Sequence, residues 1–196
     1  MRRVLPLLLI LAVLAPAAAQ EKPDAMSSIF LVAKKDMADP FFRDSVVLVT
    51  HRVTAGPIGV IVNRPTGLTV AKALPDAAEA GNARELVYFG GPVAADTLVV
   101  VFRATDPPKE ATEVMKGVYM TMERPVIRDL LKRNLPPKDI RFFAGYAGWG
   151  IGQLEGEVAR GGWLLVRADA ESLFDKRPEN LWQELHRRAA AKVAAR

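Results

Sequence analysis

The run GYAGWGIGQLE, from Gly145 to Glu155, has four glycines in its first eight positions. Glycine brings no side chain to a core, so it is retained where the backbone needs a positive φ angle or where another group must approach closely. An apolar run, 140–144, precedes the glycines, and a helix-compatible run, 154–159, follows them. We therefore expect a strand, a glycine-rich turn and the start of a helix.

Apolar and β-branched runs predict the other elements. Residues 45–51 and 57–63 are joined by a short loop containing Gly56, which predicts a hairpin. Residues 124–133 place four aliphatic side chains on one face and predict an amphipathic helix. Further strands are expected at 28–33, 86–89, 97–103, 117–122 and 163–166, and further helices at 69–74, 170–174 and from 179 onward. Because strands and helices are interleaved without strict alternation, we expect a single α+β domain with a mixed sheet.

The first 19 residues have the order of a signal peptide. Arg2 and Arg3 form a charged start, residues 4–15 are apolar, and small residues at 17–19 precede Gln20. We expect cleavage there, a periplasmic or secreted protein, and no stable membrane anchor afterwards, because the chain has no cysteine to carry a lipid. Met26 leaves an alternative, since translation that begins at Met26 would leave the protein in the cytoplasm.

The charge of the chain gives little support to nucleic-acid binding. Loss of residues 1–19 would remove two arginines and no acidic residue, so the net charge would fall from +5 to +3. Arg124, Arg128 and Lys132 could follow phosphates, but a row of charges opposite an apolar stripe is more typical of a solvated helix face. No helix-turn-helix or zinc-finger pattern accompanies it, so nucleic acid is not an expected partner.

Catalytic groups are scarce in this sequence. The absence of cysteine excludes disulfides, thiolate metal sites and a cysteine nucleophile. Of the two histidines, His51 shares a strand with Ser45, but six residues of strand separate them by roughly 20 Å. No metal-ligand spacing appears, so we expect no metal and no cofactor. The sequence favours a binding protein over an enzyme, with a hydrolase that uses a carboxylate and a metal as the alternative.

The glycine-rich segment also suggests a ligand site. A phosphate cradle is disfavoured, because no Lys-Ser or Lys-Thr follows the glycines and because Glu155 and Glu157 near the helix start would repel an anion. Trp149 could plug the core or form a stacking floor for a ligand. Two more loops stand at expected strand ends, where ligands often bind: residues 63–65 (NRP) and residues 90–92 (GGP). Asn63 in the first loop could instead satisfy only the backbone groups of the turn. The candidate ligand-binding residues are Asn63, Arg64, Gly90, Gly91, Tyr146, Gly148, Trp149, Gly150 and Gln153. Their ligand is expected to be a small molecule or a protein partner.

Several strings together resemble the YqgE/AlgH family of bacterial proteins. In the family's order they are FLVA (30–33), DPFF (39–42) with SVV (45–47), GVIVNRP (59–65), FGGPV (89–93), GYAGWG (145–150) with GQLE (152–155), Trp163, LFD (173–175) and Trp182. The resemblance covers residues 28–186, which leaves 20–27 as an extension and 187–196 as an Ala/Arg-rich tail. It implies one α+β domain with a mixed, partly barrel-like sheet flanked by helices.

The same resemblance implies no reaction. The family has a regulatory label linked to transcription, so an intracellular regulator that begins at Met26 is an alternative to an exported binding protein. Three features depart from the family pattern. Lys34-Lys35-Asp36 replaces a Met-Pro turn, Phe102-Arg103 replaces Leu-His, and the signal-like leader is unusual. A site built around the family's histidine is therefore not expected here, because Arg103 stands at that position.

Overall fold

The computed structural model describes residues 28–52, 56–75 and 79–194, so the expected signal peptide and the 20–27 extension lie outside the described residues. The strands are β1 (Ile29–Ala33), β2 (Val46–Arg52), β3 (Gly56–Ile61), β4 (Pro65–Thr69), β5 (Leu86–Phe89), β6 (Val93–Arg103), β7 (Thr112–Met115), β8 (Val118–Thr121), β9 (Ile140–Gly148) and β10 (Trp163–Arg167). The helices are α1 (Val70–Ala73), α2 (Arg124–Arg133), α3 (Gln153–Ala159), α4 (Ala170–Phe174) and α5 (Pro178–Ala194), with a 3-10 turn η2 (Pro137–Asp139).

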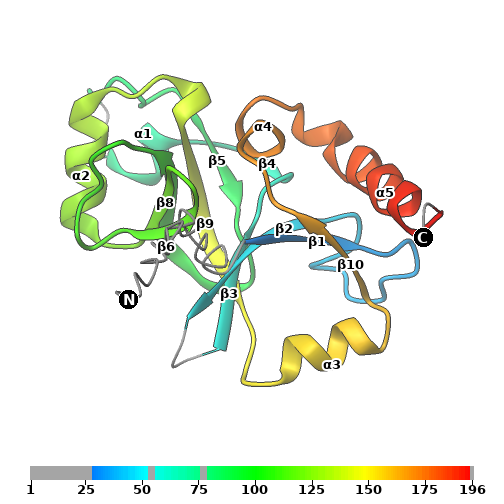
Figure 1. Ribbon diagram of the computed structural model, residues 1–196. Helices are drawn as coiled ribbons and strands as arrows, with labels where there is room; N and C mark the ends of the chain where they lie inside the picture. The colour runs from blue at the N-terminus through cyan, green and yellow to red at the C-terminus, as the bar shows by residue number, and fades with distance from the viewer. Residues whose placement is uncertain (1–27, 53–55, 76–78, 195–196) are drawn as a thin grey trace, which may run out of the picture.

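The strands form one curled, half-barrel sheet, as the predicted fold class required. The main path runs β10-β1-β2-β3-β9-β6-β8-β7, and β5 joins it by pairing with β9. That pairing is parallel, whereas the other strand pairs are antiparallel, so the sheet is mixed. Figure 1 shows β6, β8 and β9 beside α2, and β1, β2 and β10 between α3 and α5.

Strand β1 is buried on both faces, which explains its unbroken apolar sequence. Phe30 and Val32 face the cluster that includes α5, whereas Leu31 and Ala33 face the cluster that includes Trp149 and α3. Alternate side chains of a strand point to opposite faces, so β1 connects both layers. Helix α5 is also fixed to this strand, because the indole of Trp182 donates a hydrogen bond to the carbonyl of Ala33 at 2.7 Å.

The predicted amphipathic helix is confirmed as α2. Its four aliphatic side chains (Val126, Ile127, Leu130 and Leu131) pack on the outer face of the sheet, against Val100, Phe102, Ile140 and Phe142. Its basic residues Arg124, Arg128 and Lys132 lie exposed on the other side. Asn134, in the left-handed conformation, ends the helix and donates its backbone N–H to Leu131.

The glycine-rich turn predicted from Gly145 is wrong in its position. Strand β9 continues through Gly148, and the turn comes only between Trp149 and Gly152, before α3. Gly145 has a positive φ of 69° inside the strand, and a Cβ atom at this position would lie 2.5 Å from the carbonyl oxygen of Gly91. Glycine is therefore the residue that fits both the backbone angle and the close contact. The extension of β9 depends on pairing with β3 and β6, which local patterns cannot show.

Other boundaries differ where pairing with distant partners decides them. The hairpin of β2 and β3 is confirmed, but β6 begins four residues before the expected 97, and β4 and β7 were not predicted. Helix α5 continues to Ala194 and so includes most of the segment set apart as a tail. No helix among the described residues combines the length and the apolar character needed to cross a membrane.

Candidate functional site

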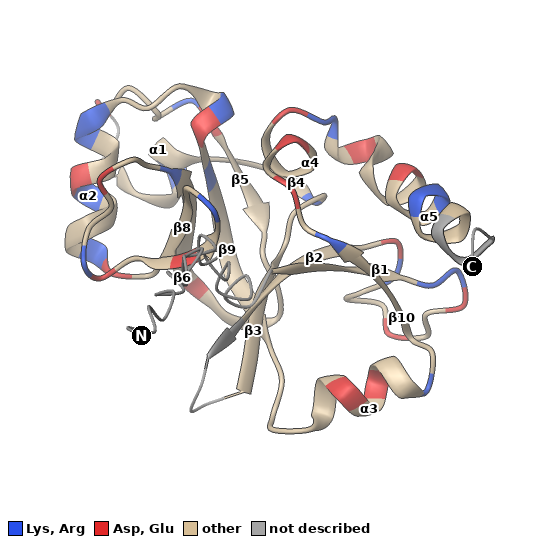
Figure 2. Cartoon of the chain, in the orientation of Figure 1, with Lys and Arg blue, Asp and Glu red and all other residues tan. Residues whose placement is uncertain are grey.

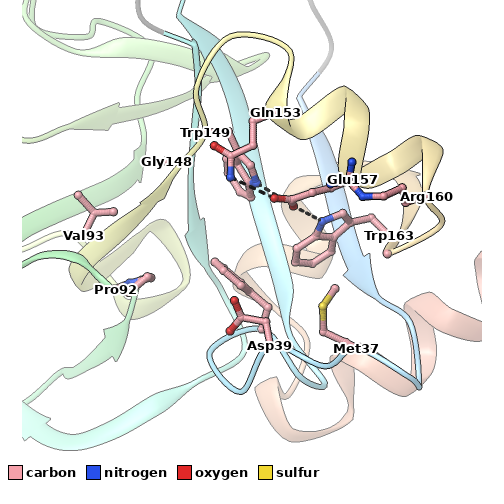
Figure 3. A pocket seen from close by; sticks show the side chains of 12 residues that line it. Met37, Asp39, Pro92, Val93, Gly148, Trp149, Gln153, Glu157, Arg160 and Trp163 are labelled. Carbon is pink, nitrogen blue, oxygen red and sulfur yellow. Dashed lines mark hydrogen bonds between the residues drawn. The ribbon is translucent and has the colours of Figure 1, made fainter.

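A pocket lies where the turn after β9 and helix α3 face the loop of residues 34–45. Its volume is about 310 Å³. The side chains come from three directions: the 34–45 loop, the segment just after Gly91, and the β9–α3–β10 region (Figure 3). The lining residues are Met37, Asp39, Phe42, Pro92, Val93, Gly148, Trp149, Gln153, Glu157, Arg160, Gly162 and Trp163.

Three aromatic rings in mutual contact form one wall of this pocket. The ring of Phe42 stacks on Trp149 with centroids 6.3 Å apart and meets the edge of Trp163 at 5.5 Å. The two indoles meet edge to face at 6.5 Å. Both tryptophans are buried, with 5% and 4% of their surface exposed, whereas Phe42 is half-buried. The two roles expected for Trp149, a plug of the core or a floor for a ligand, therefore coincide in one ring, which packs in the core and also lines the pocket.

Glu157 holds both indoles in place. One carboxylate oxygen, Oε2, accepts the N–H of Trp149 at 3.1 Å and the N–H of Trp163 at 2.9 Å. The other oxygen, Oε1, accepts the amide of Gln153 at 3.2 Å. Gln153 in turn accepts the backbone N–H of Gly150 at 3.0 Å. Because Gln153 and Glu157 stand four residues apart on α3, the helix presents both side chains on one face.

The 34–45 loop, which supplies Phe42 to the aromatic wall and Asp39 to the opposite side, is tied to the sheet by Asn63 and Arg64. Asn63 accepts the backbone N–H of Val46 at 2.8 Å and donates its amide to the carbonyl of Asp44 at 2.9 Å. Arg64 donates hydrogen bonds from Nη1 to the carbonyl of Phe41 and from Nη2 to the carbonyl of Arg43. Burial lowers the pKa of the Arg64 guanidinium, and the negative charges of Asp44 and Asp39 oppose that shift. These two predicted site residues therefore position the pocket wall without lining it.

Gly90 and Gly91 lie behind the pocket, where they allow the backbone between β5 and β6 to approach the backbone of β9 closely. Gly90 donates its N–H to Ala144 on β9 and accepts the N–H of Ile61, both at 2.8 Å. A Cβ at Gly91 would lie 2.3 Å from the carbonyl carbon of Tyr146. This contact places the following residues, Pro92 and Val93, at the pocket edge. Tyr146 is half-buried against the main core cluster.

Of the nine predicted site residues, Gly148, Trp149 and Gln153 line the pocket, and the other six lie around it. Sequence reasoning missed most of the lining, above all Asp39, Phe42, Glu157 and Trp163. One signal was present, because the spacing of Gln153 and Glu157 predicts that the two side chains share a helix face. No signal in the sequence connects the 34–45 loop with α3.

The charged groups at the pocket are Asp39, Glu157 and Arg160. Asp39 and Glu157 extend from opposite sides, as Figure 3 shows. Arg160 lies back along α3, with Nη1 only 3.2 Å from the position that a Cβ at Gly156 would take. Figure 2 shows acidic residues along α3. Formal charge at the lining is therefore negative by one unit.

Arg103, which stands where the family was expected to have histidine, belongs to a different region. Its guanidinium lies 3.4 Å from Asp139 and 3.4 Å from Asp175, and it covers the ring of Phe174 at 4.8 Å. These contacts connect the end of β6 to α4 and to the turn before β9. Within the described part of the chain, no three His, Asp or Glu residues gather closely enough to hold a metal ion.

Comparison with known proteins identifies the family and the fold of this chain. The model of a family described as AlgH-like matches residues 30–194. The chain belongs to the AlgH-like family. This confirms the resemblance to the YqgE/AlgH proteins and the α+β fold that it implied.

Relatives of this AlgH-like chain match over most of their length. A UPF0301 protein of Thioalkalivibrio sulfidiphilus is 36% identical over 157 residues, which cover 79% of this chain and 84% of that protein. A UPF0301 protein of Streptomyces coelicolor is 33% identical over 177 residues, covering 87% and 90%.

Two solved structures share the fold of this AlgH-like chain. The solution structure of the AlgH protein from Pseudomonas aeruginosa has a TM-score of 0.70 and 31% identity, and the match covers 88% of this chain and 92% of that one. The crystal structure of protein DIP2367 from Corynebacterium diphtheriae has a TM-score of 0.68 at 23% identity, covering 87% and 90%. The second likeness concerns the fold alone.

Proposed function

We propose that this protein is a non-catalytic binding module whose ligand occupies the pocket between α3 and the 34–45 loop. The observation that supports this most directly is the arrangement of Glu157 and the two indoles. A half-buried carboxylate holds Trp149 and Trp163 in one fixed geometry beside an open cavity. Sites for small molecules are typically concave, mostly apolar, and formed before the ligand arrives.

The lining residues favour binding over chemistry. Among the described residues that line the pocket there is no serine, threonine, histidine, lysine or tyrosine, so Asp39 and Glu157 are the side chains of its wall that could act as nucleophiles or proton carriers. The carboxylate of Glu157 is occupied by three N–H donors, and Asp39 accepts the backbone N–H of Phe41 at 2.8 Å. Both carboxylates thus serve as fixed acceptors in the apo protein. A regulatory role would follow if the ligand alters a protein contact.

The indole N–H signals provide the test. The chain has three tryptophans, and Trp182 donates to Ala33 on another part of the molecule, so it serves as an internal reference. In a screen of small molecules by ¹H–¹⁵N NMR, we expect ligands with dissociation constants of about 1 mM or tighter to shift the indole signals of Trp149 and Trp163 and to leave Trp182 in place.

A pocket-filling variant makes the same test specific. Gly148→Leu adds bulk at the pocket wall where a Cβ meets nothing closer than a ring atom of Tyr146 at 3.4 Å, and it should weaken binding at least about tenfold. Gly67→Leu, with no atom within 4 Å of its Cβ position, is the matched control and should bind normally. Failure of every compound to shift the two indoles, or equal binding by Gly148→Leu, would contradict the proposal.

We also propose that the protein acts outside the cytoplasm. The support is the sequence of residues 1–19, with its charged start, apolar run and small-residue cleavage site. Mass spectrometry of the protein from its native host should therefore find an N-terminus at Gln20. An N-terminus at Met26 would contradict export and favour the intracellular regulator instead.

A further inference from the structure

We propose that the pocket ligand is a small organic cation, an ammonium or guanidinium group attached to a flat apolar part. This inference rests on the binding role proposed above and adds the chemical class of the ligand. It is drawn from three properties of the lining: which hydrogen-bonding groups remain free, where the charges stand, and how the rings are oriented.

Both carboxylates at the pocket keep acceptor positions that a ligand could use. An ionised carboxylate offers about four lone-pair positions. The indole N–H groups of Trp149 and Trp163 and one N–H of Gln153 are already used on Glu157, which leaves that carboxylate one position. Asp39 uses Oδ1 for the N–H of Phe41, and no hydrogen bond from a described residue reaches its Oδ2. A ligand that donates hydrogen bonds therefore finds acceptors on both sides of the pocket.

The charges agree with a positive ligand. Asp39 and Glu157 reach the pocket from opposite walls, so a cation between them would be near both carboxylates (Figure 3). Two guanidinium groups lie near these carboxylates. Arg160 lines the pocket and lies along α3 over Gly156, whereas Arg64 donates to loop carbonyls behind the wall. The lining therefore carries two carboxylates against one guanidinium, a net charge that favours a cation over an anion.

The rings favour the same class of ligand. Both indoles turn their N–H edges, the positively polarised part of the ring, towards Glu157. The faces of aromatic rings are negatively polarised and attract cations, and Phe42, the half-buried ring of the three, is the one that a cation in the pocket can reach best. A volume of about 310 Å³ is at the low end for small-molecule sites, which limits the ligand to one ring and a short arm.

Three matched probes test the charge of the ligand. Phenethylamine, 2-phenylethanol and 3-phenylpropionate share a phenyl ring and a short chain, and they are positive, neutral and negative at pH 7. We expect phenethylamine to shift the indole signals of Trp149 and Trp163 with an affinity at least about tenfold higher than that of the alcohol, and the carboxylate to be weaker still. Added salt should lower the binding affinity of phenethylamine and leave that of 2-phenylethanol unchanged.

The variant Asp39→Asn tests whether the charge of Asp39 causes the preference for a cation. Asparagine keeps an acceptor for the N–H of Phe41 and removes the charge. This variant should bind phenethylamine about fivefold more weakly and should bind 2-phenylethanol with unchanged affinity. Asp36→Asn, an exposed residue of the same loop outside the lining, should affect neither probe.

Each other outcome decides between the two proposals. If the three probes bind equally, or if the carboxylate binds best, the pocket remains a binding site and the cation inference is wrong. If none of the three shifts the indoles while other compounds in the screen do, the cation inference is again wrong. If no compound of any charge shifts them, the binding role itself fails.

Discussion

Replacing Gly91 with alanine should lower the free energy of unfolding by about 3 kcal/mol or more, among the largest effects expected from a single methyl group. The added Cβ would lie 2.3 Å from the carbonyl carbon and 2.4 Å from the carbonyl oxygen of Tyr146, and 2.5 Å from the nitrogen of Ala147. All three atoms belong to the backbone of β9, which cannot move aside without breaking its pairing with β6 and β3. Urea unfolding followed by circular dichroism measures the change.

Two other glycines provide controls for this result. A Cβ at Gly67 meets no atom within 4 Å, so Gly67→Ala should change stability by less than about 0.5 kcal/mol. Gly148 belongs to the same glycine-rich run as Gly145, yet a Cβ there meets its nearest atom at 3.4 Å, an ordinary contact. Gly148→Ala should therefore be tolerated. If Gly91→Ala proved as stable as these two variants, the close approach of the two backbones would be refuted.

Glu157→Ala should lower the free energy of unfolding by about 2–4 kcal/mol. The substitution leaves two indole N–H groups without an acceptor, and both tryptophans are almost fully buried, so each donor loses its partner without gaining full access to water. An unsatisfied buried donor costs about 1–3 kcal/mol, so two of them would cost about 2–6 kcal/mol, and partial access to water after the truncation places the expected loss in the lower part of that range. Freed from Glu157, the indoles should also move, which tryptophan fluorescence and the two indole N–H signals would report.

Two substitutions on α3 separate the role of this carboxylate from that of charge in general. Glu157→Gln keeps one acceptor oxygen for the indoles and should lose about half as much stability. Glu155→Ala removes an exposed acidic residue in the first turn of the same helix, where it has only a favourable interaction with the helix dipole, and should cost less than about 1 kcal/mol. Equal losses from Glu155→Ala and Glu157→Ala would show that the indoles do not depend on Glu157.

Local patterns were sufficient for elements whose burial follows the sequence. The aliphatic stripe of α2 identified a helix, because it buries one regular set of side chains, and the continuous β-branched runs of β2 and β3 identified a hairpin, because these strands are buried on both faces. They were insufficient for β4 and β7. Strand β4 (PTGLT) is exposed along most of its length and has neither a long apolar run nor β-branched alternation, so only its pairing with β5 makes it a strand.

The candidate site was partly predictable for the same reason. The glycine-rich run indicated Gly148, Trp149 and Gln153, since a bulky ring between glycines is unusual wherever the chain folds. The roles of Asn63, Arg64, Gly90 and Gly91 were not predictable, because each acts on a backbone segment that is distant in sequence. Loop residues at strand ends can bind a ligand or support a neighbouring loop, and the sequence pattern is the same in both cases.

The amino-acid sequence by itself determined the family, the α+β class and most of the regular elements, because periodicity and turn chemistry act over a few neighbouring residues. The tertiary structure alone decided that β9 extends through the glycines and pairs on both edges. It also decided that Asp39 and Phe42 of the 34–45 loop meet Trp149 and Glu157 at one pocket. The physical reason is that these contacts join separate segments, and their partners become neighbours only when the curled sheet brings the segments together.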